Sequence, residues 1–141
     1  MKKILVLLTA LFIMVSCSLD NDAKPFDLEF LPILSVDTPE VVVPGQSYNF
    51  TVYYRRPNDC YFANGFDYKA DGAIRTVALQ AIVIEDSDCL SLDTAEMETM
   101  SFQFDCPLVY SNSAYLFRFY QGENLTSGED TFLNVEIPVQ Q

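Results

Sequence analysis

From Pro25 onward, hydrophobic residues recur at every second position, which is the period of a β-strand with one buried face. This alternation predicts seven strands, at residues 26–30, 48–54, 60–66, 74–85, 100–104, 115–119 and 132–139. Strands of this length at intervals of about 8–15 residues, in a stretch of about 115 residues, are typical of a β-sandwich. A closed β-barrel is the main alternative.

The first predicted strand carries a specific expectation about its faces. Phe26, Leu28 and Phe30 alternate with Asp27 and Glu29. We therefore expect the three apolar side chains to be buried and the two carboxylates to face solvent. The longest apolar stretch, 74–85, is expected to bury one face in the same way, through Val77, Leu79, Ala81 and Val83.

Turn residues separate the predicted strands. Pro44-Gly45 predicts a tight turn, because proline fixes φ and glycine can adopt a positive φ. Asn64-Gly65, inside segment 60–66, predicts either a hairpin-like turn or a bulge. Residues 91–98 are ambiguous, since Ser91 or Asp93 could cap a short helical turn.

The turn at Pro44-Gly45 leads into an aromatic-rich strand, and Tyr115 opens the penultimate strand two residues before Phe117. These features resemble bacterial immunoglobulin-like domains, in which Tyr115 would be the candidate for a tyrosine corner. The chain contains no tryptophan, so the likeness does not extend to antibody domains. We predict an immunoglobulin-like antiparallel β-sandwich over residues 26–141.

The N-terminus has a different pattern. Lys2 and Lys3 precede an apolar run over residues 4–15, too short to span a bilayer as a stable helix, which takes roughly 20 residues. Its length is that of a helical signal-peptide core. The run ends at Ser16-Cys17, which resembles the lipobox of bacterial lipoproteins. The resemblance implies cleavage of residues 1–16 and acylation of Cys17, for example with palmitate; an ordinary secretory peptide is the alternative.

Residues 17–25 are short and polar, and we interpret them as a flexible tether. Asp20 and Asp22 resemble the acidic export signal of Bacteroidetes-type surface lipoproteins. That resemblance implies a lipid-anchored protein on the outer face of the outer membrane. An acidic linker on a periplasm-facing lipoprotein is the alternative.

Charge and composition exclude several classes of partner. The formal net charge is −12, and loss of Lys2 and Lys3 with the signal peptide would make it −14. Such a surface repels phosphate backbones, so nucleic acid is excluded as a partner. Anionic lipid would repel it too, which leaves the acyl chains to hold it at the membrane. The chain is 50% hydrophobic, far too apolar for a disordered acidic segment.

Three cysteines remain when Cys17 is assigned to lipid. Outside the cytosol this number indicates one disulfide and one free thiol. Cys60 and Cys89 both lie next to an aspartate at the end of a predicted strand, and they are the preferred pair. Cys89 with Cys106 is the alternative. Cys106 fits a small buried position beyond Phe104.

The chain has no histidine, which removes the commonest general base and the usual zinc ligand. We predict that it is not an enzyme and that it needs no cofactor or metal. Two carboxylates alone suffice for glycoside hydrolysis, so a carboxylate-based hydrolase is a distant alternative. Its candidate residues are Glu85, Asp86 and Asp88, or Glu123, Glu129 and Asp130. Asp86 and Asp88 could also bind calcium, but they lack the glycine and distal glutamate of an EF-hand loop.

Tyrosines that point outward from the strands are the candidates for recognition of a sugar or a protein surface. The predicted binding residues are Tyr53, Arg55, Arg56, Asn58, Tyr120 and Gln121. Segments 55–60 and 117–122 would lie together only if their strands pair.

Residues 25–141 resemble small immunoglobulin-like lipoproteins of Bacteroidetes-type genomes, through the lipobox, the acidic tether and segments 56–60 and 117–122. The resemblance implies no particular activity. Our hypothesis is a membrane-anchored surface lipoprotein that acts as a non-enzymatic binding or structural module. The alternative is an accessory subunit of a nutrient-uptake or adhesion complex that binds glycan or protein.

Overall fold

The computed structural model describes residues 25–84, 88–92 and 96–140. These residues form eight β-strands and no helix, which confirms the predicted all-β fold. The strands are β1 (Phe26–Leu31), β2 (Ile33–Asp37), β3 (Ser47–Tyr54), β4 (Tyr61–Asp71), β5 (Ile74–Ile84), β6 (Glu98–Asp105), β7 (Ala114–Glu123) and β8 (Asp130–Pro138). The predicted signal peptide, Cys17 and the tether up to residue 24 lie outside the described residues.

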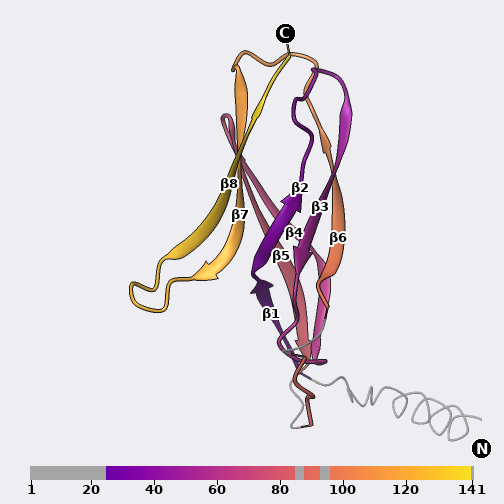
Figure 1. Cartoon of the computed structure of the whole chain (residues 1–141), viewed down its shortest axis with the longest axis vertical. Helices are drawn as coiled ribbons and strands as arrows, with labels where there is room; N and C mark the ends of the chain where they lie inside the picture. The colour runs from indigo at the N-terminus through magenta and orange to yellow at the C-terminus, as the bar shows by residue number, and fades with distance from the viewer. Residues whose placement is uncertain (1–24, 85–87, 93–95, 141) are drawn as a thin grey trace, which may run out of the picture.

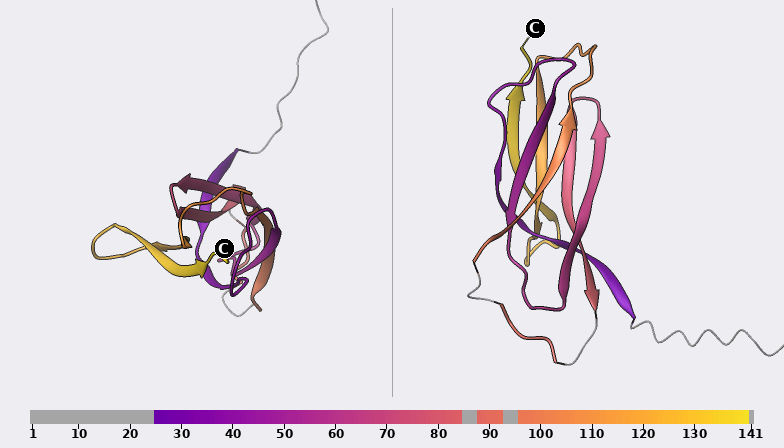
Figure 2. Two further views of the ribbon diagram at one scale, coloured as in Figure 1. Left: turned by 90° about the horizontal axis from the view of Figure 1, so that it is seen from above. Right: turned by 90° about the vertical axis from the view of Figure 1, so that its right-hand side faces the viewer.

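The strands form two sheets, which is the arrangement of a sandwich and not of a closed barrel. Sheet A contains β4, β5, β1, β7 and β8, and sheet B has the order β2-β3-β6. Within sheet A, β5 pairs with β4 along one edge, and its other edge pairs with β1 and then with β7. The β5–β7 pairing is parallel, a departure from the predicted antiparallel arrangement. Figures 1 and 2 show an elongated domain with β1 beginning at one end and the C-terminus at the other.

The eighth strand arises because the first apolar segment changes sheets. Leu31 pairs with Leu79 in sheet A, whereas Ile33 pairs with Tyr54 in sheet B. Pro32 stands between them and has no N–H to donate to a continuing ladder. Leu31 and Ile33 are both buried, so this crossing closes one edge of the core.

Aromatic rings fill the core between the sheets. Phe117 is completely buried, with its ring centroid 4.7 Å from Phe50 and 5.2 Å from Phe104. Stacked and edge-to-face rings at these separations stabilise a core beyond the area they bury. The predicted inward face of β5 is confirmed, since Val77, Leu79 and Ala81 are fully buried and Val83 is half-buried.

Tyr115 is fully buried at the start of β7, but its hydroxyl makes a different contact from that of a tyrosine corner. The Cys106 thiol lies 3.9 Å from this hydroxyl. Burial is the main cause that raises the pKa of Tyr115. The neighbouring Tyr110 stacks on the ring with centroids 4.0 Å apart, and its own hydroxyl donates to the Ala114 carbonyl. The contact of the Tyr115 hydroxyl is thus with a side chain, whereas a tyrosine corner bonds to the backbone upstream of itself.

The expected burial of the apolar side chains of the first strand was wrong, whereas Asp27 and Glu29 are exposed as expected. Phe26 is 59%, Leu28 56% and Phe30 44% exposed. Apolar and acidic residues do alternate along the strand. Leu31, however, projects from the same face as Glu29, and it is Leu31 that enters the core. The apolar side chains of β1 therefore lie on the outer face of sheet A.

Asn64-Gly65 forms a bulge and not a turn. The β4–β5 register shifts between Ala63 and Gly65, and Gly65 has a φ of +147°. The extra residue reverses the phase of the strand. Phe62 consequently points outward and is 47% exposed, whereas Phe66 packs against the core.

The described part of the segment between β5 and β6 contains a turn at Asp88 and a β-bridge at Ser91. Ser91 forms a β-bridge with Asn58, so it does not cap a helical turn. Asp93, the other candidate cap, lies outside the described residues.

Candidate functional site

The outer face of sheet A carries a row of apolar side chains contributed by three strands. Leu28 on β1 and Phe62 on β4 both pair with Ile82 on β5, and Phe26 pairs with Ile84. Residues directly opposite each other in antiparallel strands project from the same face. We call this surface the outer patch; its residues are Phe26, Leu28, Phe30, Phe62, Ile82 and Ile84.

A groove of about 260 Å³ continues the outer patch toward the β7–β8 hairpin. Phe30 belongs to both surfaces, and its ring centroid lies 5.8 Å from that of Tyr120. Tyr120 in turn lies 6.2 Å from Phe132 on β8, in an edge-to-face arrangement. We call this the aromatic groove; its lining residues are Phe30, Asp67, Lys69, Thr76, Ala78, Tyr120, Glu123, Asp130 and Phe132.

The aromatic groove has more acidic than basic groups. Asp67, Glu123 and Asp130 line it, whereas Lys69 supplies one ammonium group that lies 3.2 Å from the Asp67 carboxylate. The pKa of Tyr120 is raised, first by partial burial and then by the negative charges of Asp130 and Glu123. The groove is therefore an apolar floor with an acidic rim.

The shape of the β7–β8 hairpin positions this acidic rim. The β7–β8 register shifts between Tyr120 and Gly122, and Gly122 has a φ of +101°, which suits glycine. The Thr131 hydroxyl donates to the Gly122 carbonyl at 2.7 Å. Beyond this bulge Glu123 pairs with Asp130, and the hairpin leans away from the rest of the sandwich (Figures 1 and 2).

A second cavity, of about 400 Å³, lies beside the β3–β4 loop. Arg55 and Arg56 line it together with Glu29, Tyr61 and apolar side chains. Arg56 donates through Nε to Glu98 at 2.6 Å and through Nη1 to the Tyr61 carbonyl at 3.0 Å. Through these contacts Arg56 holds the β3–β4 loop against β6. Arg55, in contrast, is exposed.

The remaining predicted binding residues do not line one common cavity. The Tyr53 hydroxyl donates to Asp37 at 2.6 Å on sheet B. Asn58 accepts from the Cys60 N–H, and Gln121 donates to the Ile33 carbonyl at 3.4 Å. Tyr120 is the one predicted residue that lines the aromatic groove. Segments 55–60 and 117–122 are not paired, because β3 belongs to sheet B, and β4 and β7 contact different edges of β5.

Phe30, Phe132 and the outer patch were not among the predicted contact residues, because alternation along a strand was equated with burial of its apolar side chains. One signal for them was available on β5. Residues 81–84, Ala-Ile-Val-Ile, are apolar at both parities, so both faces of β5 are apolar. A strand with two apolar faces indicates that the outer face of its sheet is covered by another part of the protein or by a partner molecule.

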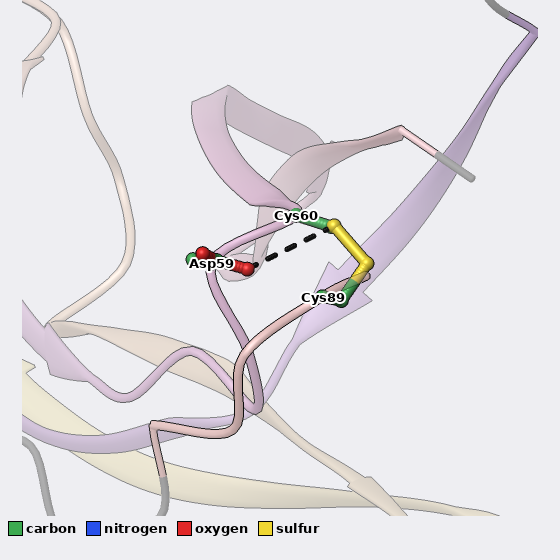
Figure 3. A group of neighbouring side chains, drawn as sticks. All are labelled: Asp59, Cys60 and Cys89. Carbon is green, nitrogen blue, oxygen red and sulfur yellow. Dashed lines mark hydrogen bonds between the residues drawn. A yellow bond between two sulfur atoms is a disulfide. The ribbon is translucent and has the colours of Figure 1, made fainter. Parts of the chain in front are cut away.

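The predicted disulfide between Cys60 and Cys89 is confirmed, with Cα atoms 5.6 Å apart (Figure 3). Cys106 is free and buried, as expected. Next to the disulfide, the Asp59 N–H donates to the Leu90 carbonyl at 3.0 Å, and the Leu90 N–H donates back to the Asp59 carboxylate. The bridge and these bonds hold the β3–β4 loop against residues 89–92.

Among the described residues, Asp59, Cys60 and Cys89 are the one group of three candidate metal ligands with closely spaced ligand atoms. Figure 3 shows that the two sulfur atoms are bonded to each other, so they cannot act as thiolate ligands. The dashed contact from Cys60 Sγ to Asp59 spans 3.9 Å and involves a sulfur without a proton. The group is a covalent cross-link and not a metal site.

The candidate carboxylates for a hydrolase or a calcium site fall into two places. Glu85 and Asp86 lie outside the described residues, and Asp88 is exposed next to the disulfide. Glu123 and Asp130 oppose each other across the hairpin, where both line the aromatic groove. Glu129 belongs to the turn, and its carbonyl accepts from the Asn124 N–H.

The part of the chain that the structure describes contains no helix long and apolar enough to cross a membrane. Comparisons with protein-family models, with curated proteins and with solved structures find no match to this chain.

Proposed function

We propose that the protein is a lipid-anchored, non-enzymatic binding module at the outer-membrane surface, with the outer patch and the aromatic groove as its contact surface. The observation that carries the binding role is the exposure of four large apolar side chains on one sheet face. Phe26, Leu28, Phe30 and Phe62 are each between 44% and 59% exposed. Contiguous apolar surface of this kind marks interaction sites on soluble domains.

The position of the contact surface supports action close to a membrane. Phe26 begins β1 only nine residues after Cys17, the proposed lipid attachment point. An extended chain of that length spans at most about 32 Å. The outer patch therefore begins at the end of the domain next to the anchor, where it can contact another component of the same membrane. This placement favours the alternative in which the protein is an accessory subunit of a nutrient-uptake or adhesion complex.

The anchor and the cellular location are tested by proteolysis of intact cells. We expect the wild-type protein to be digested on unbroken cells and to remain in the membrane fraction after lysis. A Cys17→Ala variant, which removes the acylated thiol, is expected to lose both properties. Immunoblotting of cells and fractions measures this. Protection of the wild type until the outer membrane is opened would contradict surface display.

The contact surface is tested by photo-crosslinking in intact cells. We expect a photoreactive residue at Phe62 to give a discrete cross-linked product with a cell-surface component. The same residue at Val109, which is 88% exposed on a loop outside the outer patch, is the control. Equal products from both positions, or none from Phe62, would contradict binding through the outer face of sheet A.

A further inference from the structure

The outer patch and the aromatic groove form one continuous surface with two kinds of chemistry. Phe30 connects them, because it lies beside Leu28 on β1 and its ring meets Tyr120 in the groove. The outer patch is apolar along β1, β4 and β5, whereas the groove has three carboxylates and one ammonium at its rim, with the Arg118 guanidinium over the ring of Phe132. A partner that covers this surface must therefore complement both the apolar outer patch and the acidic rim of the groove.

Charge disfavours a second copy of the chain and an anionic bilayer as occupants. A two-fold symmetric dimer whose axis passes through the groove would place the same acidic rim opposite itself. The carboxylates of Asp67, Glu123 and Asp130 would then face one another, in a chain whose formal net charge is already −12. Like charges brought together without compensation oppose association. The same field repels acidic lipid headgroups.

The aromatic groove is suited to a cationic side chain. A guanidinium or ammonium group over an aromatic ring is attracted by the ring's quadrupole, and nearby carboxylates add to that attraction. Among the described residues, the Arg75 guanidinium makes such a contact 4.8 Å from the Tyr115 ring centroid. A second lies at the groove itself, where the Arg118 guanidinium is 4.1 Å from the ring centroid of Phe132. Phe132 therefore already has a cationic partner, which leaves Tyr120 as the ring for a partner's side chain.

From this juxtaposition we infer that the partner is a protein segment that presents lysine or arginine beside apolar side chains. The basic side chain enters the aromatic groove between Tyr120 and the carboxylates of Glu123 and Asp130. The apolar residues cover Leu28 and Phe62 on the outer patch. The inference rests on the proposed binding function and gives it a partner class.

The test uses the mature lipoprotein in phosphatidylcholine nanodiscs, with binding measured by fluorescence anisotropy. Three labelled decapeptides of alternating leucine and a second residue are compared, the second residue being lysine, glutamine or glutamate. We expect the lysine peptide to bind at least about ten-fold more tightly than the other two, and to weaken as salt is raised. Equal affinity for the lysine and glutamine peptides would overturn the inference.

Paired variants locate the effect. We expect Glu123→Gln with Asp130→Asn to weaken binding of the lysine peptide about ten-fold and to flatten its salt dependence. Glu40→Gln with Asp71→Asn changes the net charge equally at exposed positions outside the groove, and is expected to leave affinity within about two-fold. Equal losses in both pairs would mean that the overall charge alone attracts the peptide, which overturns a site in the groove.

Two further outcomes separate this inference from the proposed function. An unlabelled hexasaccharide such as cellohexaose is tested as a competitor of the labelled lysine peptide. If it binds more tightly than the lysine peptide, and if Tyr120→Ala abolishes its binding, the groove is assigned to glycan and the inference of a protein partner is overturned. Self-association in sedimentation experiments would likewise assign the face to a second copy. In both cases cross-linking from Phe62 would still support a binding module, whereas its absence would remove the proposed function itself.

Discussion

Phe117→Ala is expected to lower the free energy of unfolding by about 3–5 kcal/mol, the usual cost of emptying a buried phenylalanine site. Phe117 is completely buried, and its ring meets Phe50 and Phe104 from sheet B and Phe119 on its own strand. Rings from both sheets line the site, so the space left by the truncated side chain cannot close without separating them. Domains are stable by about 5–15 kcal/mol, so the loss is a large share of the total. Urea denaturation followed by tyrosine fluorescence or circular dichroism measures it.

Phe62→Ala is the matched control for this prediction. It removes the same atoms from a ring that is 47% exposed on the outer patch. We expect a cost below about 1 kcal/mol, because a surface position leaves no cavity. Similar losses for the two variants would contradict the assignment of Phe117 to the core and of Phe62 to the contact surface. A small loss of stability for Phe62→Ala, together with a discrete cross-linked product from the photoreactive residue at position 62, would support a role of this ring in binding.

Removal of the Cys60–Cys89 disulfide is expected to destabilise the domain by about 3–4 kcal/mol, the cost of closing a loop of this length in the chain-entropy model. The two cysteines are 29 residues apart in sequence, and the bridge ties the β3–β4 loop to the segment after β5. Either a reductant or the double variant Cys60→Ser, Cys89→Ser removes it. Denaturation midpoints with and without reductant measure the effect.

Cys106→Ala is the control for the disulfide prediction. Cys106 is free and buried, so this variant is expected to retain the disulfide and its sensitivity to reductant. Peptide mapping under non-reducing conditions identifies the bridge. Loss of the bridge in Cys106→Ala would instead favour the alternative Cys89–Cys106 pairing. A midpoint that reductant does not change would contradict a stabilising role for the disulfide.

The fold class was accessible from sequence because alternation of apolar and polar residues is a local property. The strand β5 and the inward positions Val77, Leu79 and Ala81 were predicted correctly. The change of sheet at Pro32 was not, because nothing local distinguishes a strand that ends from one that continues in another sheet. The parallel β5–β7 pairing depends on how distant strands assemble, and periodicity contains no information on that.

The candidate site was predicted less well than the fold. Tyr120 was identified as an outward aromatic, but Phe30, which makes it part of a groove, comes from a strand far away in sequence. Phe132 lies opposite Tyr120 on the next strand, where it was expected to be a core residue. Arg56 was expected to bind a ligand, and the structure shows it paired with Glu98. The side chains at a strand end acquire such partners only after the sheets have packed.

By itself, the sequence determined the all-β class, most strand positions and the preferred cysteine pair, since these follow from periodicity, turn residues and spacing. It determined that apolar and acidic residues alternate along β1, but not that both sets stay exposed and that Leu31 is the residue that enters the core. Tertiary structure alone decided that. Leu31 and Ile33 place the crossing between sheets, and the crossing leaves Phe26, Leu28 and Phe30 on the outer face beside Phe62 and Tyr120. A period of two defines two faces, and only packing against the second sheet selects the buried one.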